Sequence, residues 1–282
     1  MKVHEALRWA SLFLEEHHRE QPVAEILLQH HMAYSRVQLL SSLREALPVD
    51  KQQAFIDDIK RHVDTGVPVQ HLTGKEVFYG RDFSVSKDVL IPRPETEELI
   101  EGVLQQLDEA PWTVVDLGTG SGIIAITLKL ERPDLTVHAC DISEAALSVA
   151  SQNATRLQAD VNFHQGDFMQ PILDQGKAVD IIVSNPPYIP YVDKSSLSDT
   201  VKNFDPELAL FAEDNGLAAY HKIVMQAKQL PTLPKMIAFE IGYQQGEQVS
   251  EIIKHSFPTS TVDIRQDING KDRMVFAVIP SV

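Results

Sequence analysis

The sequence has little of what marks a secreted, disulfide-bonded or membrane-inserted protein. Among its 282 residues Cys140 is the single cysteine, which rules out an internal disulfide and fits a reducing compartment. No uninterrupted apolar run is long enough to span a membrane, and the N-terminus lacks the apolar segment of a signal peptide. We therefore expect a cytoplasmic protein without a membrane partner.

Positive charge is also scarce. The chain has 25 Lys and Arg against 40 Asp and Glu, for a formal net charge of -15. A large nucleic-acid footprint requires clustered basic residues, and the sequence has no dense basic run. We expect no direct contact with nucleic acid. Hydrophobic residues make up 43% of the chain, which is enough to bury a sizeable core, and 282 residues leave room for one large domain or for a large and a small one.

The hydrophobic pattern divides the chain into three parts. Residues 1–67 carry apolar side chains at helical steps of three and four, which predicts a small helical bundle. In residues 68–92 the runs Leu72–Gly80 and Phe83–Ile91 predict two strands of a β-hairpin linker. Over residues 93–282 strands and helices alternate, which predicts a mostly parallel sheet covered on both faces. The Asn-Gly pair at 269–270 predicts an antiparallel last strand.

A glycine-rich turn follows the first strand of the third part. Gly118, Gly120 and Gly122 have the spacing G-x-G-x-G, whereas a dinucleotide-binding loop has G-x-G-x-x-G. The glycines let a ligand approach the backbone, and no pyrophosphate is implied. Asp116 beside the loop suits a cationic group such as an ammonium. These features fit S-adenosylmethionine better than NAD.

Two more acids follow the next strands. Asp141 ends the second strand, where an acid can accept hydrogen bonds from both ribose hydroxyls. Asp167 follows the third strand, where it can accept from an adenine amine while Phe168 packs on the ring. Each acid alone is better explained as a helix cap or a solvated loop residue. Together with Asp116 they favour a ligand crevice at the strand ends.

A second candidate site lies in the stretch Ile181–Tyr188, where a buried strand ends in Asn-Pro-Pro-Tyr. The prolines hold Asn185 extended and stiffen the turn. The side-chain oxygen of Asn185 and the carbonyl oxygen of Pro186 are two acceptors beside the ring of Tyr188. This arrangement suits a planar group with an NH2, either a side-chain amide or an exocyclic base amine.

These elements resemble the class I S-adenosylmethionine-dependent methyltransferases. Four segments stand in the order and spacing of the peptide chain release factor glutamine N5-methyltransferases: Leu90–Glu97, Asp116–Gly122, Ser184–Ile189 and Phe204–Ala209. The glycine loop and Asn-Pro-Pro-Tyr are shared with DNA adenine methyltransferases, whereas Ile-Pro-Arg-Pro-Glu-Thr is much more specific. The resemblance covers nearly the whole chain. One departure is Phe168, which stands where some members carry Trp.

The resemblance implies a Rossmann-like α/β methyltransferase domain over 93–282 and a helical bundle that docks a release factor. It implies methyl transfer from S-adenosylmethionine, with S-adenosylhomocysteine as product, to the glutamine N5 in the Gly-Gly-Gln motif of release factors 1 and 2. We expect a monomer and no metal. The expected cofactor residues are Asp116, Gly118, Thr119, Gly120, Ser121, Gly122, Asp141, Asp167, Phe168 and Asn185. The expected substrate residues are Asn185, Pro186, Pro187 and Tyr188, of which Asn185, Pro186 and Tyr188 are expected to be catalytic.

The expected chemistry is direct in-line transfer without a covalent intermediate. A sulfonium methyl donor removes the need to deprotonate the amide first, and two acceptors orient the nitrogen and stabilise its developing positive charge.

Several alternatives stay open at this stage. An adenine N6-methyltransferase fits the same motif but needs base flipping and phosphate contacts, which the net charge of -15 opposes. Methylation of another protein glutamine, a non-catalytic cofactor-binding regulator and an NAD-dependent dehydrogenase are the others. The intact Asn-Pro-Pro-Tyr opposes the regulator, and the loop spacing opposes the dehydrogenase.

Overall fold

The computed structural model describes residues 1–280, which fall into two compact units. The first unit consists of Met1–Lys75 and Ser198–Phe204. The second consists of Glu76–Leu197 and the described residues from Asp205 onward. In the part of the chain that the structure describes, no helix combines the length and the apolar character needed to cross a bilayer.

The first unit is built from amphipathic helices. Its apolar stripes meet in one core that includes Leu14, Leu27, Phe55 and Ile59. The longest helix begins after Pro48, and its last turn is closed by a glycine with positive φ. The helices are α1 (Val3–Glu16), α2 (Pro22–Met32), α3 (Arg36–Ser41), α4 (Val49–Thr65), α5 (Val69–Thr73) and α10 (Asp199–Phe204).

The second unit contains a seven-stranded sheet with the order β10-β11-β9-β6-β3-β4-β5. Strands β9, β6, β3, β4 and β5 are parallel, whereas β11 pairs antiparallel with both β9 and β10. The predicted, mostly parallel α/β sheet with an antiparallel last strand is therefore confirmed. Its strands are β3 (Thr113–Leu117), β4 (Thr136–Asp141), β5 (Asn162–Gln165), β6 (Ile181–Ser184), β9 (Met236–Glu240), β10 (Thr261–Gln266) and β11 (Asp272–Val278).

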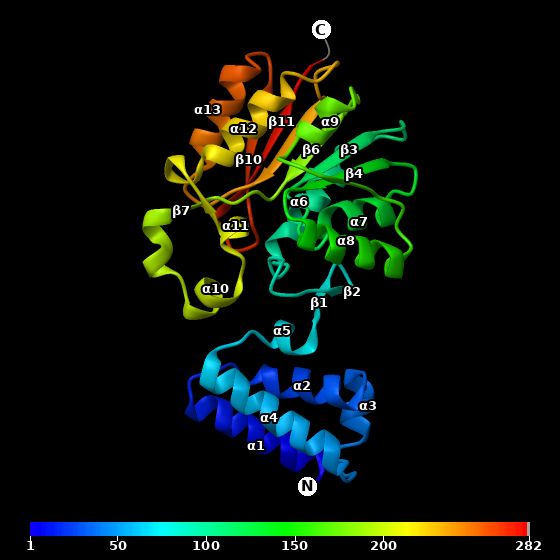
Figure 1. Ribbon diagram of the computed structural model, residues 1–282, viewed down its shortest axis with the longest axis vertical. Coiled ribbons are helices and arrows are strands. Elements are labelled where there is room, and N and C mark those ends of the chain that lie inside the picture. Colours follow the sequence, from blue (N-terminus) through cyan, green and yellow to red (C-terminus); the bar gives the residue numbers. More distant parts are fainter. Residues whose placement is uncertain (281–282) are drawn as a thin grey trace. The chain divides into compact units, whose positions relative to one another are not determined.

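Helices cover both faces of this sheet, because neighbouring strand residues point to opposite sides. Val115 and Ile182 belong to the core beneath α9, α12 and α13, whereas Val114 and Val183 belong to the core beneath α6, α7 and α8 (Figure 1). The helices of this unit are α6 (Glu95–Leu104), α7 (Ile123–Glu131), α8 (Glu144–Leu157), α9 (Gln170–Asp174), α11 (Glu207–Leu210), α12 (Ala218–Ala227) and α13 (Gly246–Ser256).

Smaller elements complete the second unit. The expected hairpin forms a two-stranded sheet of β1 (Lys75–Phe78), whose first residue still belongs to the first unit, and β2 (Arg81–Ser84). Both strands are shorter than the pattern predicted. Residues 72 and 73 lie in α5 instead, because Pro68 begins a helical turn there. The other small elements are β7 (Ile189–Pro190), β8 (Phe211–Ala212) and the 3-10 helices η1 (Tyr191–Ser196) and η2 (Asp214–Gly216).

The topology reverses between β3 and β6. The chain runs outward from β3 through β4 to β5, and then returns to place β6 on the other side of β3. Open α/β sheets bind ligands at the carboxyl ends of strands at such a switch point. The glycine loop follows β3 and Asn-Pro-Pro-Tyr follows β6, so both motifs lie at this edge.

Candidate active site

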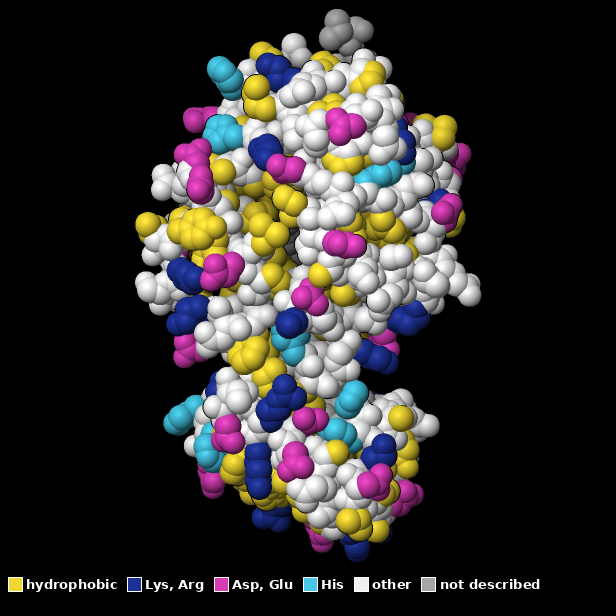
Figure 2. Space-filling view, in the orientation of Figure 1, with side chains coloured by type: hydrophobic (Ala, Val, Ile, Leu, Met, Phe, Trp, Pro, Cys, Tyr) yellow, Lys and Arg dark blue, Asp and Glu magenta, His cyan; other side chains and the backbone are white. Residues whose placement is uncertain are grey.

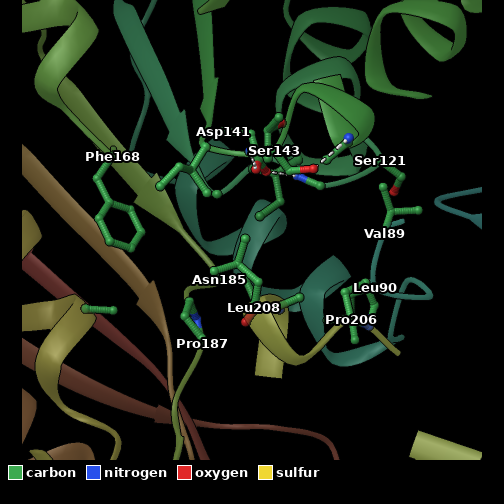
Figure 3. A pocket seen from close by; sticks show the side chains of 18 of the residues that line it. Val89, Leu90, Ser121, Asp141, Ser143, Phe168, Asn185, Pro187, Pro206 and Leu208 are labelled. Atoms are coloured by element: carbon green, nitrogen blue, oxygen red, sulfur yellow. Dashed lines mark hydrogen bonds between the residues drawn. The ribbon is translucent and has the colours of Figure 1, made fainter. Parts of the chain in front are cut away.

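A cavity of about 330 Å³ opens at the carboxyl ends of β3, β4 and β6. In the space-filling view apolar side chains gather around a hollow in this unit (Figure 2). The cavity brings together segments that are far apart in the sequence (Figure 3). It is lined by residues 88–90, 92, 93, 96, 118–121, 123, 124, 141–143, 146, 167, 168, 185, 187, 206, 208, 209, 211, 212, 218, 219 and 222.

The glycine loop forms one wall of the cavity. Gly118 and Gly120 have φ values of 72° and 55°, and a Cβ on either would meet no other residue of the described chain, apart from its direct neighbours, within 4 Å. Their backbone therefore stays open to a ligand. Gly122 has φ 85°, and a Cβ there would lie 2.8 Å from Ile126 Cδ1 and 3.1 Å from Ala150 Cβ. It serves the packing of the loop against α7 and α8 and does not line the cavity.

Asp116 lies beneath the glycine loop, fully buried, and is not among the residues that line the cavity. Its carboxylate accepts hydrogen bonds from Thr119 Oγ1 at 2.6 Å and from the Ala125 N–H at 3.3 Å. Burial raises the pKa of Asp116 to about 7, although these two hydrogen bonds oppose the shift. The structure therefore shows Asp116 holding the loop to the start of α7, while Thr119 and Ser121 line the cavity.

Asp141 lines the cavity at the end of β4. Its carboxylate accepts from the Gly120 N–H at 2.9 Å and from the Ser143 N–H at 2.9 Å, so it ties the loop to the start of α8. Burial raises the pKa of Asp141 and outweighs these hydrogen bonds. A carboxylate has about four lone-pair sites, which leaves acceptor capacity for hydroxyl groups in the cavity.

Phe168 points its ring into the cavity (Figure 3). Its φ of 50° is unusual for a bulky residue, and such conformations concentrate at ligand sites. The side chain of Gln226 in α12 holds this turn, because Oε1 accepts from the Met169 N–H at 3.0 Å and Nε2 donates to the Asp167 carbonyl at 3.2 Å. Asp167 forms an ion pair with Lys222, and both residues line the cavity.

The Asn-Pro-Pro-Tyr segment forms the opposite wall. Asn185 and Pro187 line the cavity, whereas Pro186 is buried. Among residues 1–280 no hydrogen bond reaches the Pro186 carbonyl oxygen or Asn185 Oδ1. The segment is tied to the glycine loop, because Ser184 Oγ donates to the Leu117 carbonyl at 2.6 Å.

Tyr188 lies behind this wall and does not line the cavity. Its ring packs on the core that faces α12 and α13, and burial raises its pKa to about 12. Its carbonyl oxygen accepts from Gln245 Nε2 at 3.0 Å. The expected contact between the Tyr188 ring and a substrate stays a prediction, and the observed contacts anchor the end of the segment.

Several residues at the site escaped the sequence patterns. Asn185 Nδ2 donates to Thr96 Oγ1 at 3.3 Å, and Thr96 Oγ1 donates to Glu240 Oε2 at 2.6 Å. Arg93 donates to Asp205 at 2.9 Å, which joins the Pro-Arg-Pro segment to the Phe-Asp-Pro segment. Glu240 had one available signal, since it is the only acid in the otherwise apolar strand Met236–Glu240.

Two family descriptions match the sequence. Residues 5–74 match the PrmC N-terminal domain, and residues 98–204 match the Methyltransferase small domain. A release factor glutamine methyltransferase from Bacillus anthracis is 44% identical over 99% of this chain and 100% of its own length. The protein of that name from Bacillus subtilis is 44% identical over 98% of each chain, and the one from Staphylococcus aureus is 41% identical over 91% of each.

Solved structures with a similar fold include the human METTL16 catalytic domain in complex with an RNA hairpin. It has a TM-score of 0.57 and 15% identity, and the match covers 82% of each chain. The N-terminal domain of human METTL16 in complex with SAH has a TM-score of 0.53 and 13% identity, over 92% of this chain and 94% of that one. At this level of identity the likeness shows the fold alone.

Proposed function

The chain belongs to the release factor glutamine methyltransferase family, and from that premise we propose that it methylates the Gly-Gly-Gln glutamine of peptide chain release factors 1 and 2. The protein is an S-adenosylmethionine-dependent glutamine methyltransferase that acts on release factors. The observation that carries the finer proposal is the pair of acceptors, Asn185 Oδ1 and the Pro186 carbonyl oxygen, that no described group occupies.

The cavity residues fit S-adenosylmethionine, which supplies a methyl group on a sulfonium when bound. Gly118 and Gly120 leave open backbone where a ligand can approach, and Asp141 keeps acceptor capacity for ribose hydroxyls. The ring of Phe168 offers a flat apolar surface for a base. We assign these residues, with Thr119 and Ser121 of the loop, to cofactor binding. We also assign Asp167 to cofactor binding, as an acceptor for the adenine amine. Its carboxylate forms an ion pair with Lys222 as well.

The acceptor pair acts on the glutamine amide. Two hydrogens of an amide NH2 are accepted by Asn185 Oδ1 and the Pro186 carbonyl, which fixes the amide plane and directs the nitrogen toward the methyl group. The same oxygens stabilise positive charge as it develops on the nitrogen. The methylated nitrogen then loses one of its two hydrogens as a proton to solvent, which gives the neutral N-methyl amide. Each such interaction contributes about 3–4 kcal/mol in related cases, whereas positioning contributes about 7–11 kcal/mol. Positioning is therefore the larger effect, and a rigid proline corner suits it.

Within the Asn-Pro-Pro-Tyr segment the four residues divide the work. Asn185 and Pro186 contact the amide, and Pro187 forms part of the wall beside it. Tyr188 anchors the segment, because its carbonyl oxygen accepts a hydrogen bond of 3.0 Å from Gln245. We further propose that its ring contacts the substrate.

The proposal is tested by incubating the protein with labelled S-adenosylmethionine and either a release factor or DNA, followed by mass spectrometry of the labelled product. We expect the label on the Gly-Gly-Gln glutamine. A Gly-Gly-Glu variant of the release factor is the matched control, because it removes the NH2 while keeping the size of the side chain. Label on DNA or on another residue would contradict the proposal.

The nucleic-acid alternative is an adenine N6-methyltransferase. An adenine amine also carries two hydrogens, so the acceptor pair alone does not separate it from glutamine. The net charge of -15 and the family membership favour the protein substrate.

The helical bundle of the first unit is assigned to docking of the release factor, since it matches the PrmC N-terminal domain over residues 5–74. We further propose that the protein acts as a monomer in the cytoplasm, where release factors work on ribosomes.

A further inference from the structure

Asn185 can serve as an acceptor only if its side-chain oxygen faces the substrate. The two ends of an amide side chain have similar shapes, but the oxygen accepts hydrogen bonds whereas the NH2 group donates two. If the NH2 of Asn185 faced the substrate, it would meet the NH2 of the glutamine, and two donors cannot form a hydrogen bond with each other. Something in the protein has to fix which way the amide points.

The contacts around Asn185 set that direction. The Thr96 hydroxyl has one hydrogen, which it donates to Glu240 Oε2 at 2.6 Å. Toward Asn185 the hydroxyl can then only accept, and it accepts from Asn185 Nδ2 at 3.3 Å. The NH2 of Asn185 is thereby held on Thr96, and Oδ1 is left for the cavity. Thr96 and Glu240 are only 1% and 2% exposed, so water does not compete for these bonds.

We propose that Glu240 and Thr96 are positioning residues for methyl transfer, which act as a one-way hydrogen-bond relay that turns the Asn185 oxygen toward the glutamine amide. This inference rests on the proposed function, because it assigns a purpose to the orientation of Asn185. It also assigns a role to the Pro-Glu-Thr part of the segment Leu90–Glu97, since Thr96 lies in the first turn of helix α6.

The relay depends on the ionisation of Glu240. A carboxylate can only accept, which forces the Thr96 hydrogen toward it. A protonated carboxyl can donate to Thr96, which frees the hydroxyl hydrogen for Asn185 Oδ1 and removes the reason for the NH2 to face Thr96. Burial raises the pKa of Glu240 to about 7, which places this change near neutral pH.

Other groups around Glu240 modify this titration. Arg273 in β11 favours the carboxylate, as do the hydrogen bonds from Thr96 and Asn185, whereas Glu95 at the start of α6 opposes it. Tyr188 and Tyr220 also face it, and burial keeps both neutral by raising the pKa of their hydroxyls. Tyr220 donates to the Glu240 backbone carbonyl at 2.9 Å and leaves the carboxylate free for the relay.

The test is single-turnover methylation of a release factor by the wild-type protein and three relay variants. Thr96→Val keeps the shape but removes the hydroxyl, and we expect the transfer rate to fall by about ten- to a hundredfold while cofactor affinity, measured by calorimetry, changes little. Thr96→Ser retains the hydroxyl and should restore most of the rate. Thr127→Val is the matched control. Thr127 is fully buried in α7 and does not line the cavity, and its hydroxyl has no hydrogen-bond partner among residues 1–280.

The pH profile separates a relay from a merely structural role. Wild-type rate should decline as the pH falls below about 7, the pKa to which burial raises Glu240. Glu240→Gln can both donate and accept, so we expect a lower maximal rate without this decline. A melting temperature for each variant identifies those that fail to fold. Among folded variants, Thr96→Val keeps the shape without the hydroxyl and Thr96→Ser keeps the hydroxyl, so their rates show whether the hydroxyl is what matters.

The outcomes are distinct. A Thr96→Val rate equal to that of wild type, or the same acid decline in Glu240→Gln, would overturn the relay while leaving the proposed function intact. A wild-type protein that transfers no methyl group to the release factor would overturn both.

Discussion

Replacing Gly216 by Ala should damage catalysis without touching the cavity. Gly216 has φ 85° and lies beneath the Asn-Pro-Pro-Tyr segment, and a Cβ there would be 2.1 Å from the Tyr188 carbonyl oxygen and 2.7 Å from Gln245 Nε2. Real Cβ atoms do not come so near to a backbone oxygen, so the carbonyl has to move and its 3.0 Å hydrogen bond from Gln245 is lost. The Tyr188 end of the Asn-Pro-Pro-Tyr segment, which carries the two acceptors, shifts with this carbonyl.

The magnitude follows from three contributions. An alanine with left-handed φ costs about 1–2 kcal/mol in stability, and loss of the hydrogen bond adds about 1 kcal/mol. Relief of the clash requires a backbone shift, and misplacement by about 1 Å at a catalytic site can cost about a hundredfold in rate. We expect the free energy of unfolding to fall by about 2–3 kcal/mol and the single-turnover rate by one to two decades.

Gly176→Ala is the matched control. Gly176 has φ 60°, but a Cβ there would meet nothing within 4 Å, so the backbone cost is present without the clash. Denaturant unfolding and single-turnover methylation of both variants separate the two effects. Equal losses of stability and rate in Gly216→Ala and Gly176→Ala would refute the reasoning that Gly216 holds the acceptor wall.

Three further predictions concern the cavity and the buried acids. Asn185→Ala should reduce the single-turnover rate by about two or more decades, with cofactor binding checked separately by calorimetry; a rate near wild type would remove the proposed mechanism. Asp141→Asn should weaken cofactor binding measured by calorimetry, because it places a donor among the Gly120 and Ser143 N–H groups; unchanged affinity would argue against the ribose contact. Asp116→Asn should alter the pH dependence of stability. Burial raises the pKa of Asp116 from 3.8 to about 7, so the folded protein holds a proton that the unfolded chain loses, and this group makes stability decrease as pH rises through that window. Unfolding curves of wild type and variant at a series of pH values should therefore differ by this slope, and identical slopes would contradict the shift.

The two ends of the site were predictable from the sequence because each is a local motif. A strand followed by closely spaced glycines, and a strand stopped by two prolines, fix their own backbone. The parallel sheet followed from the alternation of strands and helices, and it brings Gly118, Asp141, Phe168 and Asn185 to one cavity.

The support behind the site was not predictable, because it depends on contacts between segments far apart in the chain. Thr96 and Glu240 are separated by 144 residues, and nothing within either local segment indicates that the two side chains are hydrogen-bonded to each other. Asp116 and Tyr188 were recognised from their motifs, but the sequence did not show that neither side chain lines the cavity. Packing places Asp116 beneath the glycine loop and Tyr188 behind the Asn-Pro-Pro segment. Which face of a motif meets the ligand is decided by the surrounding core.

The central claim is that the Asn185 oxygen and the Pro186 carbonyl together receive the NH2 of the substrate glutamine. A crystal structure of the protein with S-adenosylhomocysteine and a release factor that carries its Gly-Gly-Gln motif tests it most directly. The account predicts both oxygens about 2.7–3.2 Å from the glutamine amide nitrogen. A glutamine nitrogen bound elsewhere, or an Asn185 whose NH2 faces it, would contradict the account.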